Sequence, residues 1–416
     1  MAKPKIIIIG GGAAGLMAAK ELAASHSILL IESDLRLGGR MHTFKSEYSS
    51  RAIEAGAEFI HGNLPITQQL LKEAGIEYTA VEGEMYRKKN GKWSEQEEMI
   101  EGWDEILNKM KAMPDDMTLY DFLEQYYKDK KYESTRTHIS NFAEGFDVAD
   151  IKKVSVKALY KEWSHEEPNY RIPKGYGALV NYLQQECEKQ GAEILAGYTV
   201  KRIYWQKGLV TVYTHDGERY DADKAIITVP LTVLRSVSEK EETSIRFIPA
   251  LDNYKRAAAN IGIGPVLKII LQFEKPFWKK DTGFILSDEI FPTWWTQSPD
   301  PYPMLTGWIG GPRVENFKND KEEQILEKAL QSLANIYELS LEEIKKNTKA
   351  SSIFNWQDGA YSYPTPKTPE ARKLLNKPIE NTLFFAGEGI YEGESQGTVE
   401  AGLASGREAA QKCKVV

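Results

Sequence analysis

The sequence is poor in cysteine and histidine. Its 416 residues include two cysteines, Cys187 and Cys413. Two are too few for a disulfide scaffold or a cysteine-ligated zinc site, and they suit a reducing compartment. The six histidines show neither HxH nor HExxH spacing. Because zinc sites use such closely spaced ligands, the sequence predicts no metal centre.

Excess positive charge and long apolar runs are also absent. The chain carries 53 Lys and Arg against 60 Asp and Glu, a net charge of −7. Nucleic-acid binding needs clustered basic side chains, so we expect no such partner. No apolar run approaches the roughly 18 residues of a membrane span. The run at residues 6–9 is too short for a signal peptide and ends in glycine, so we expect a cytoplasmic protein without a membrane partner.

Apolar and aromatic side chains are plentiful. Hydrophobic residues make up 42% of the chain, and there are 21 Tyr and 9 Trp. That composition and length allow about two well-packed domains. The aromatic residues are available to line a pocket.

The N-terminal segment has the pattern of a nucleotide-binding unit. A β-branched strand at 5–9, a helix at 13–24 and an apolar strand at 27–31 predict a βαβ unit. The connecting loop fits G-x-G-x-x-G, which lets a backbone approach a pyrophosphate at a helix N-terminus. The predicted contacts of this loop are Gly10, Gly12, Ala13, Ala14 and Gly15.

An acid closes the second strand of this unit. Glu32, followed by Ser33, can accept the ribose hydroxyls of an adenosine and would repel a 2′-phosphate. Beyond it, Arg36 and Arg40 enclose Gly38 and Gly39. Such a segment can bind phosphate and flavin oxygens, but by chemistry alone a surface turn fits equally well. The dinucleotide could therefore be NAD or FAD.

Matching strand–helix patterns lie at the two ends of the chain. The apolar strand at 382–386 and the helix at 397–412 resemble the N-terminal unit in texture. We therefore predict an α/β fold with a Rossmann-like domain of discontinuous segments and an inserted α+β substrate domain. The predicted limits are 1–61, 174–230 and 380–416 for the first domain, and 62–173 and 231–379 for the second.

Several motifs together resemble the flavin-containing amine oxidase family along nearly the whole chain. They are GGGAAGL at 10–16, Glu32, RLGGRMHT at 36–43, EAGAEFIHG at 54–62, TVPLTVL at 228–234, Lys268, GAYSY at 359–363, and FFAGEG with GTVEAGLASG at 384–406. The resemblance implies FAD as cofactor, with a small-molecule amine and molecular oxygen as reactants. It also implies hydride transfer from the amine α-carbon to flavin N5, giving an imine and hydrogen peroxide.

The resemblance gives roles to single residues. It implies that Lys268 is catalytic and holds a water against flavin N5, whereas by chemistry alone Lys268 could lie on a half-exposed strand face. Trp356 and Tyr361 would flank the flavin. Ala360 stands where monoamine oxidases carry a cysteine bonded to the flavin, so we expect non-covalent FAD.

Further cofactor contacts follow from the resemblance. They are Gly56, Ala57, Glu58, Phe59, Val200, Trp356, Gly387, Glu388, Gly397, Thr398 and Val399. Glu388 would lie by the sugar and phosphate linkage. Gly397 and Thr398 open the last predicted helix, whose N-terminus would stabilise a reduced flavin, although Thr398 also suits a simple N-cap.

The predicted substrate contacts are Glu58, His61, Trp295, Tyr361 and Gln396. Amino-acid oxidases of the family place an arginine where this chain has Phe59. Glu58 would repel a carboxylate and accept a cationic amine, and Glu392 and Glu394 add local acidity. Exposed-surface and structural roles for Glu58 and His61 remain open at this point.

Three other functions were weighed. An L-amino-acid oxidase or a carbon-skeleton oxidase or desaturase could use the same FAD motifs. An arginine reaching the pocket from elsewhere, such as Arg313, would favour the amino-acid substrate. A flavin-binding interaction protein without turnover would have lost Lys268 or the aromatic wall. The sequence contains no signal of oligomeric state.

Overall fold

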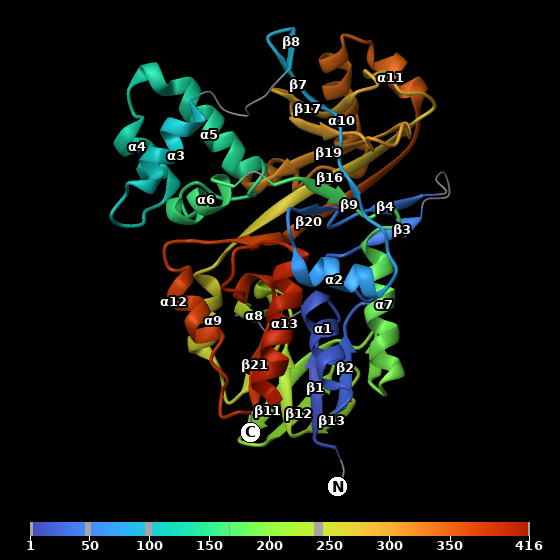
Figure 1. Cartoon of the computed structure of the whole chain (residues 1–416), viewed down its shortest axis with the longest axis vertical. Coiled ribbons are helices and arrows are strands. Elements are labelled where there is room, and N and C mark those ends of the chain that lie inside the picture. The colour runs from blue at the N-terminus through green and yellow to red at the C-terminus, as the bar shows by residue number, and fades with distance from the viewer. Residues whose placement is uncertain (1–2, 46–50, 96–101, 166, 237–243, 415–416) are drawn as a thin grey trace.

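A computed structural model describes residues 3–45, 51–95, 102–165, 167–236 and 244–414. The molecule has two tiers, each built around one β-sheet (Figure 1). The sheet of the lower tier has five parallel strands in the order β10-β2-β1-β14-β21. These strands are β1 (Lys5–Ile9), β2 (Ser27–Glu32), β10 (Glu193–Ala196), β14 (Lys224–Ile227) and β21 (Leu383–Phe385).

The parallel sheet is covered on both faces, which explains its apolar strands. One face packs against α1 (Ala13–Leu22), α7 (Tyr176–Lys189) and α13 (Val399–Lys414). A Cβ on Gly406 of α13 would lie 2.2 Å from the Ala14 carbonyl oxygen, so glycine permits the close α1–α13 contact. The other face packs against a four-stranded sheet and α8 (Leu231–Arg235) and α9 (Asp252–Ala259).

That four-stranded sheet has the order β13-β12-β11-β15. Its strands are β11 (Val200–Gln206), β12 (Leu209–Thr214), β13 (Arg219–Ala222) and β15 (Arg246–Ile248). The predicted α/β class is confirmed, and the parallel sheet brings together strands from residue 5 to residue 385.

The upper tier is built on a seven-stranded sheet in the order β20-β16-β19-β18-β17-β7-β8. Its strands are β7 (Glu84–Lys89), β8 (Lys92–Glu95), β16 (Gly262–Phe273), β17 (Thr282–Ser287), β18 (Thr293–Trp295), β19 (Met304–Gly310) and β20 (Thr348–Tyr363). Two helices, α10 (Glu322–Tyr337) and α11 (Leu341–Asn347), lie beside it at the top of Figure 1. The long strands β16 and β20 run from this sheet toward the lower tier.

A cluster of helices lies on the other side of the upper tier (Figure 1). It contains α3 (Trp103–Lys111), α4 (Leu119–Tyr126), α5 (Glu133–Gly145) and α6 (Val156–Trp163), around a core of its own. Hydroxyl caps begin two of these helices: Thr118 accepts from the Asp121 N–H and Ser155 from the Ala158 N–H.

The remaining elements are short. They are β3 (Thr43–Lys45), β4 (Ala52–Glu54), β5 (Phe59–His61), α2 (Pro65–Glu73), β6 (Thr79–Ala80), β9 (Asn169–Arg171), α12 (Thr368–Leu375) and the 3₁₀ turns Lys130–Tyr132, Gly311–Phe317 and Glu388–Ile390. Strand β9 pairs with both β5 and β6, which brings residues 169–171 beside residues 59–61.

The limits predicted for the two domains stay a prediction. Within the fold, residues of α8, α9 and α12 pack in the same core as β1 and β14, although the prediction assigned them to the substrate domain. Residues 1–2 and 415–416 lie outside the described part of the chain. Among the described residues, no helix has the length and apolar character to cross a membrane, and no group of His, Cys, Asp and Glu is arranged to hold a metal ion.

Candidate flavin and substrate site

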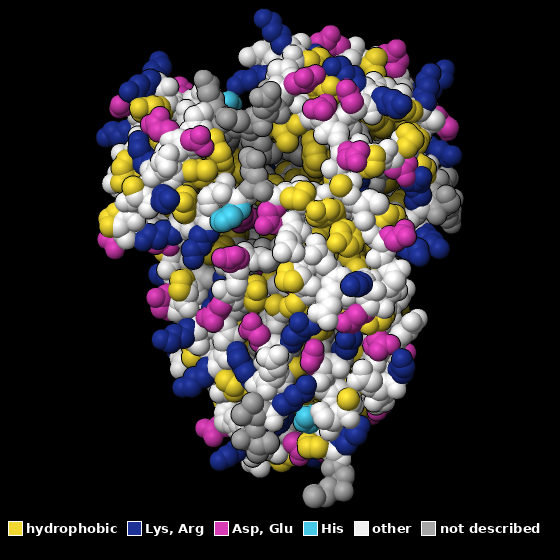
Figure 2. Space-filling model, viewed as in Figure 1, with side chains coloured by type: hydrophobic (Ala, Val, Ile, Leu, Met, Phe, Trp, Pro, Cys, Tyr) yellow, Lys and Arg dark blue, Asp and Glu magenta, His cyan; other side chains and the backbone are white. Residues whose placement is uncertain are grey.

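A cavity of about 3280 Å³ lies between the parallel sheet and the upper tier. Its walls include the loop after β1, the start of α13, and parts of β16, β18 and β20. The surface in Figure 2 is hollowed in its upper half, with apolar side chains inside the hollow. Pockets for drug-sized ligands occupy about 300–1,000 Å³, so this cavity has room for a dinucleotide together with a substrate.

The predicted phosphate loop lies between β1 and α1. Gly10, Gly12, Ala13 and Ala14 line the cavity. Helix α1 begins at Ala13, so its first N–H groups and the positive end of its dipole are directed at the cavity. A Cβ on Gly12 would meet nothing within 4 Å, whereas one on Gly15 would lie 1.9 Å from the Gly10 oxygen. Gly12 therefore leaves room for a ligand, and Gly15 allows the turn itself to close.

The Glu32 carboxylate is tied to this loop. Its Oε2 accepts from the Gly11 N–H at 2.6 Å, and its Oε1 accepts from the Asp34 N–H at 2.8 Å and from the Ser33 hydroxyl at 3.0 Å. Both Glu32 and Ser33 line the cavity. An acid at the end of β2, an open glycine and a free helix N-terminus are the set that an adenosine dinucleotide requires, so these residues fit FAD.

The two arginines of the segment 36–40 make different contacts. Arg36 pairs with Asp34 at 3.3 Å and donates to the Gly39 carbonyl at 2.8 Å, so it stabilises its own turn. Arg40 reaches across the cavity wall, where its Nη1 donates to Glu388 at 2.7 Å and to the Ala360 carbonyl at 3.0 Å. Arg36, Arg40 and the two intervening glycines, Gly38 and Gly39, line the cavity.

Glu388 joins three segments around the cavity. Besides Arg40, it accepts from the Ser362 hydroxyl at 2.6 Å and the Ser362 N–H at 3.2 Å. Glu388 and Gly387 both line the cavity. A Cβ on Gly387 would meet nothing within 4 Å, so this wall too leaves room for a ligand.

The last helix starts at the same cavity. Thr398 accepts from the Ala401 N–H at 3.2 Å and donates to the Ser395 carbonyl at 2.6 Å, which is the geometry of an N-cap. Gly397, Thr398 and Val399 line the cavity. Thr398 therefore caps the last helix and also lines the cavity. The positive end of the helix dipole is directed into the cavity.

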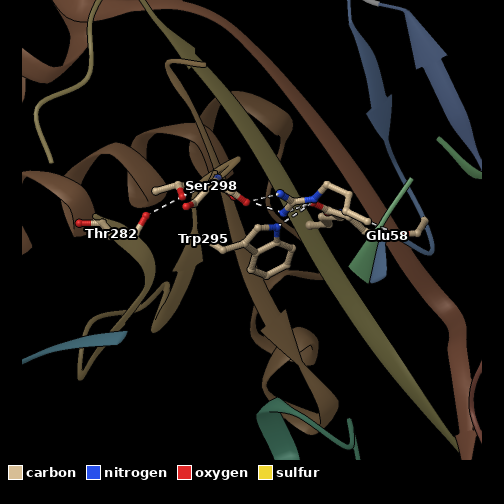
Figure 3. A network of polar contacts seen from close by, with 8 residues as sticks. Glu58, Thr282, Trp295 and Ser298 are labelled. Carbon is tan, nitrogen blue, oxygen red and sulfur yellow. Dashed lines mark hydrogen bonds and ion pairs between the residues drawn. The ribbon is translucent and has the colours of Figure 1, made fainter. Parts of the chain in front are cut away.

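Lys268 lies inside β16 and is 1% exposed, which rules out the half-exposed strand face. Its Nζ lies 2.7 Å from Glu58 Oε2 and donates to the Gly56 carbonyl at 3.2 Å. Glu58 Oε1 accepts from Arg171 Nη2 and from Trp295 Nε1, each at 3.0 Å. In Figure 3, Glu58 and Trp295 point toward one another inside a network that extends to Ser298 and Thr282.

The surroundings hold Glu58 as a carboxylate. Burial alone would raise its pKa, but the charges of Lys268 and Arg171 and the hydrogen bonds from Lys268 and Trp295 lower the pKa below its usual value. Two protein cations balance this one acid, so Glu58 does not offer uncompensated negative charge to a ligand. The predicted contact between Glu58 and substrate stays a prediction.

An aromatic wall faces the same space. Trp295, Trp356 and Tyr361 line the cavity. Trp356 donates through Nε1 to the Ala55 carbonyl at 2.9 Å, and the Tyr361 hydroxyl donates to the Phe146 carbonyl. These hydrogen bonds hold the ring orientations before any ligand binds.

The remaining predicted contacts are also cavity residues: Gly56, Ala57, Phe59, His61, Val200 and Gln396. The His61 ring donates through Nδ1–H to Asn169 Oδ1 at 2.7 Å, and desolvation lowers the pKa of His61. Gln396 donates to the Gly393 carbonyl at 3.3 Å, while its buried Oε1 has no hydrogen-bond partner among the described residues. That oxygen is an unused acceptor at the cavity wall.

Three charged residues close to this site were not among the predicted contacts: Arg171, Asp147 and Glu162. Glu162 lines the cavity, and burial raises its pKa to about 7. Asp147 accepts from the Trp163 indole at 3.0 Å, and burial followed by the charge of Glu162 raises its pKa. All three lie in a polar stretch without a recognisable motif, so no local signal marked them.

The structure bears on two further points from the sequence: Arg313 as a clamp for a substrate carboxylate, and a cysteine linked to the flavin. Arg313 lines the cavity, but it pairs with Glu144 at 3.4 Å and donates to Asn141. Cys187 and Cys413 are both buried in the core beside α1, and neither lines the cavity. No cysteine is therefore placed to form a thioether with a flavin.

The chain is similar to known flavoenzymes over its whole length. The family model described as flavin containing amine oxidoreductase matches residues 13–170 and 120–414. Polyamine oxidase 2 of Arabidopsis thaliana is 26% identical, covering 99% of this chain and 88% of the relative. Lysine-specific histone demethylase 2 of Homo sapiens is 25% identical over 98% of this chain and 53% of its own length.

Solved structures share the fold. Putrescine oxidase, solved as the wild type bound to putrescine, superposes with a TM-score of 0.80 at 18% identity, covering 98% of both chains. Cyclohexylamine oxidase from Brevibacterium oxydans IH-35A gives a TM-score of 0.78 at 20% identity, covering 98% of both chains.

The fold and the cavity define a two-tiered α/β protein with a Rossmann-like dinucleotide domain. The chain belongs to the flavin-containing amine oxidoreductase family. It is a flavin-dependent amine oxidoreductase, and FAD is its cofactor.

Proposed function

We propose that this chain oxidises a small cationic amine, with molecular oxygen as the final electron acceptor and FAD bound without a covalent link. The observation that carries the proposal is Lys268, a lysine 1% exposed in β16 that lines the cavity beside the aromatic wall. A buried ion pair such as Lys268–Glu58 is costly compared with apolar side chains of similar size, so its place at the cavity wall points to a chemical use.

The proposed reaction breaks a C–H bond next to nitrogen. The α-carbon of the neutral amine gives up hydride and the nitrogen gives up a proton, leaving an imine that water hydrolyses to a carbonyl compound and an amine or ammonia. Bound FAD supplies the two-electron acceptor for this hydride. Molecular oxygen then takes two electrons and two protons and leaves as hydrogen peroxide.

The chain contributes mainly by positioning the amine against the flavin and by attracting its positive charge. Hydride transfer needs the reacting atoms about 3–3.5 Å apart, and rigid aromatic side chains such as Trp356 and Tyr361 can set that approach. Aromatic faces also attract cations. The acids Asp358, Glu392 and Glu394 line the cavity and would attract a cationic amine.

Gln396 gives the amine a specific partner. Its Oε1 is a buried acceptor without a protein donor among the described residues, and an amine N–H can satisfy it. The Arg313 guanidinium is already paired with Glu144, so the described cavity offers no free clamp for a substrate carboxylate at that residue.

An amine panel tests the proposal. The FAD-loaded chain is mixed with monoamines, diamines, polyamines and L-amino acids, and both anaerobic flavin bleaching and peroxide are measured. We expect amines to bleach the flavin and air to restore it with peroxide. Bleaching by amino acids alone would contradict the amine substrate, and bleached flavin that air does not restore would contradict oxygen as acceptor. A cytoplasmic location is proposed on the low cysteine content alone.

A further inference from the structure

The cluster around Lys268 contains a carboxylate that has no need to touch substrate. Glu58 is 8% exposed and accepts one hydrogen bond from Lys268 and two from Arg171 and Trp295. Glu58 lies before β5, and its three donors come from strands β9, β16 and β18. Such convergence orients both carboxylate oxygens.

The Arg171 guanidinium is fixed by further contacts of its own. Its Nη2 donates to the Thr296 carbonyl at 3.2 Å and its Nη1 to the Ser298 carbonyl at 3.4 Å. The guanidinium also lies over the Phe59 ring, 5.0 Å from its centroid. Arg171 does not line the cavity, so its charge acts through Glu58 and not on a ligand directly.

Glu58 is the counter-ion of Lys268, because the residues beside Lys268 on the adjacent strands carry no charge. The residues in register with Lys268 on the two adjacent strands are Trp308 of β19 and Phe354 of β20, and neither can carry a charge that matches it. Among the described residues, the charged groups that act on this cluster are Arg171 and a second buried acid, Glu54. Glu54 is bonded to Thr43 and to the Tyr176 N–H instead of to Lys268.

We propose that Glu58, locked by Arg171 and Trp295, is a positioning residue that fixes the Nζ of Lys268 toward the flavin site and serves as its buried counter-ion. The inference rests on the proposed function and extends it, because it gives Lys268 a part in the reaction of reduced flavin with oxygen. Glu58→Gln would leave this buried ammonium group without its counter-ion, and burial without a counter-ion disfavours the charged form of an amine. An opposite charge at this distance commonly shifts such an equilibrium by about 1–3 pH units.

The test compares Glu58→Gln with Glu54→Gln in the FAD-loaded chain. Both replace an acid that is 8% exposed by its neutral isostere, so they are matched in burial and chemistry. The flavin is reduced with dithionite, which removes any need for an amine substrate, and its reoxidation by oxygen is followed from pH 6 to pH 9. We expect Glu58→Gln to react at the wild-type rate at pH 6 and at least about tenfold more slowly at pH 9. Glu54→Gln, whose acid is not hydrogen-bonded to Lys268, should depart from the wild type much less than Glu58→Gln at pH 9.

A wild-type rate for Glu58→Gln at every pH, or an equal slowing at every pH, would overturn the inference, because a merely structural role produces no shift of the profile. Rescue by Glu58→Asp, which keeps the charge, supports it.

A second readout needs neither FAD nor turnover. Unfolding midpoints of the flavin-free chain are measured for Glu58→Gln, Lys268→Met and the double variant. If the two residues act as a pair, Glu58→Gln lowers the midpoint strongly, and adding Lys268→Met recovers part of the loss. Additive losses would overturn the pairing. A wild type that oxygen fails to reoxidise counts against the proposed function, and the unfolding cycle then decides on the pair by itself.

Discussion

Gly12→Ala separates cofactor binding from folding. Gly12 caps α1 with φ −79° and ψ −169°, an extended conformation that any residue adopts. An added Cβ would meet nothing within 4 Å, and the position lines the cavity. The methyl group therefore enters the space that a pyrophosphate needs and leaves the protein contacts intact.

The magnitudes of the two effects differ widely. For the FAD-free chain, replacing Gly by Ala stabilises by about 0.4–1 kcal/mol through the unfolded state, and the poorer N-cap offsets a similar amount. For FAD, a displaced phosphate loses about two charge-assisted hydrogen bonds at about 1.5–3 kcal/mol each. That loss of about 3–6 kcal/mol weakens FAD binding by roughly two to four powers of ten.

The assay is a titration of the flavin-free variant with FAD, followed by flavin fluorescence, with unfolding midpoints measured in parallel. Gly15→Ala is the contrasting variant, because its Cβ would lie 1.9 Å from the Gly10 oxygen and should lower the midpoint even without FAD. Wild-type FAD affinity in Gly12→Ala, or a midpoint several degrees lower without FAD, would refute the reasoning.

Three further predictions follow from the site. Lys268→Met should slow reoxidation of the reduced flavin at least about tenfold while FAD still binds, and an unchanged rate in stopped-flow measurements would remove its role. Burial raises the pKa of Glu54 from 4.5 to about 7, against opposing hydrogen bonds. The folded chain therefore holds that proton more tightly, and up to about 3 kcal/mol of unfolding free energy should be lost as pH rises from about 4.5 to 7. Glu54→Gln should abolish that part of the slope in pH-dependent denaturant melts, and a slope equal to that of the wild type would contradict it. Acid precipitation should release all the FAD into the supernatant, because Ala360 offers no thiol, and flavin retained on the denatured chain would disprove non-covalent binding.

The site residues predicted from the sequence are those whose contacts lie close by in the chain. The phosphate loop, Glu32 and the start of the last helix each work through a few neighbouring backbone groups. Spacing marked the loop and Glu32, the family resemblance marked the start of the last helix, and all three reach the cavity. The environment of Lys268 was not predicted. Its partner Glu58 lies 210 positions away in the sequence, and Arg171 lies 113 positions from Glu58. No local pattern encodes such a meeting.

Tertiary structure also changed the meaning of single residues. Glu58 was expected to draw in a cation by its own charge, yet the fold surrounds it with Lys268 and Arg171. Glu162 lay unnoticed in a polar helix, and burial raises its pKa to about 7 at the cavity wall.

By itself, therefore, the sequence determined the class of fold and marked a dinucleotide-binding loop, because short-range hydrogen bonding and glycine geometry carry those features. The choice of FAD over NAD came from the family resemblance. Only the tertiary structure decided the charge balance around Lys268 and which acids remain available to a substrate. Electrostatic energies depend on distance and burial in three dimensions, and neither is written in the order of residues along the chain.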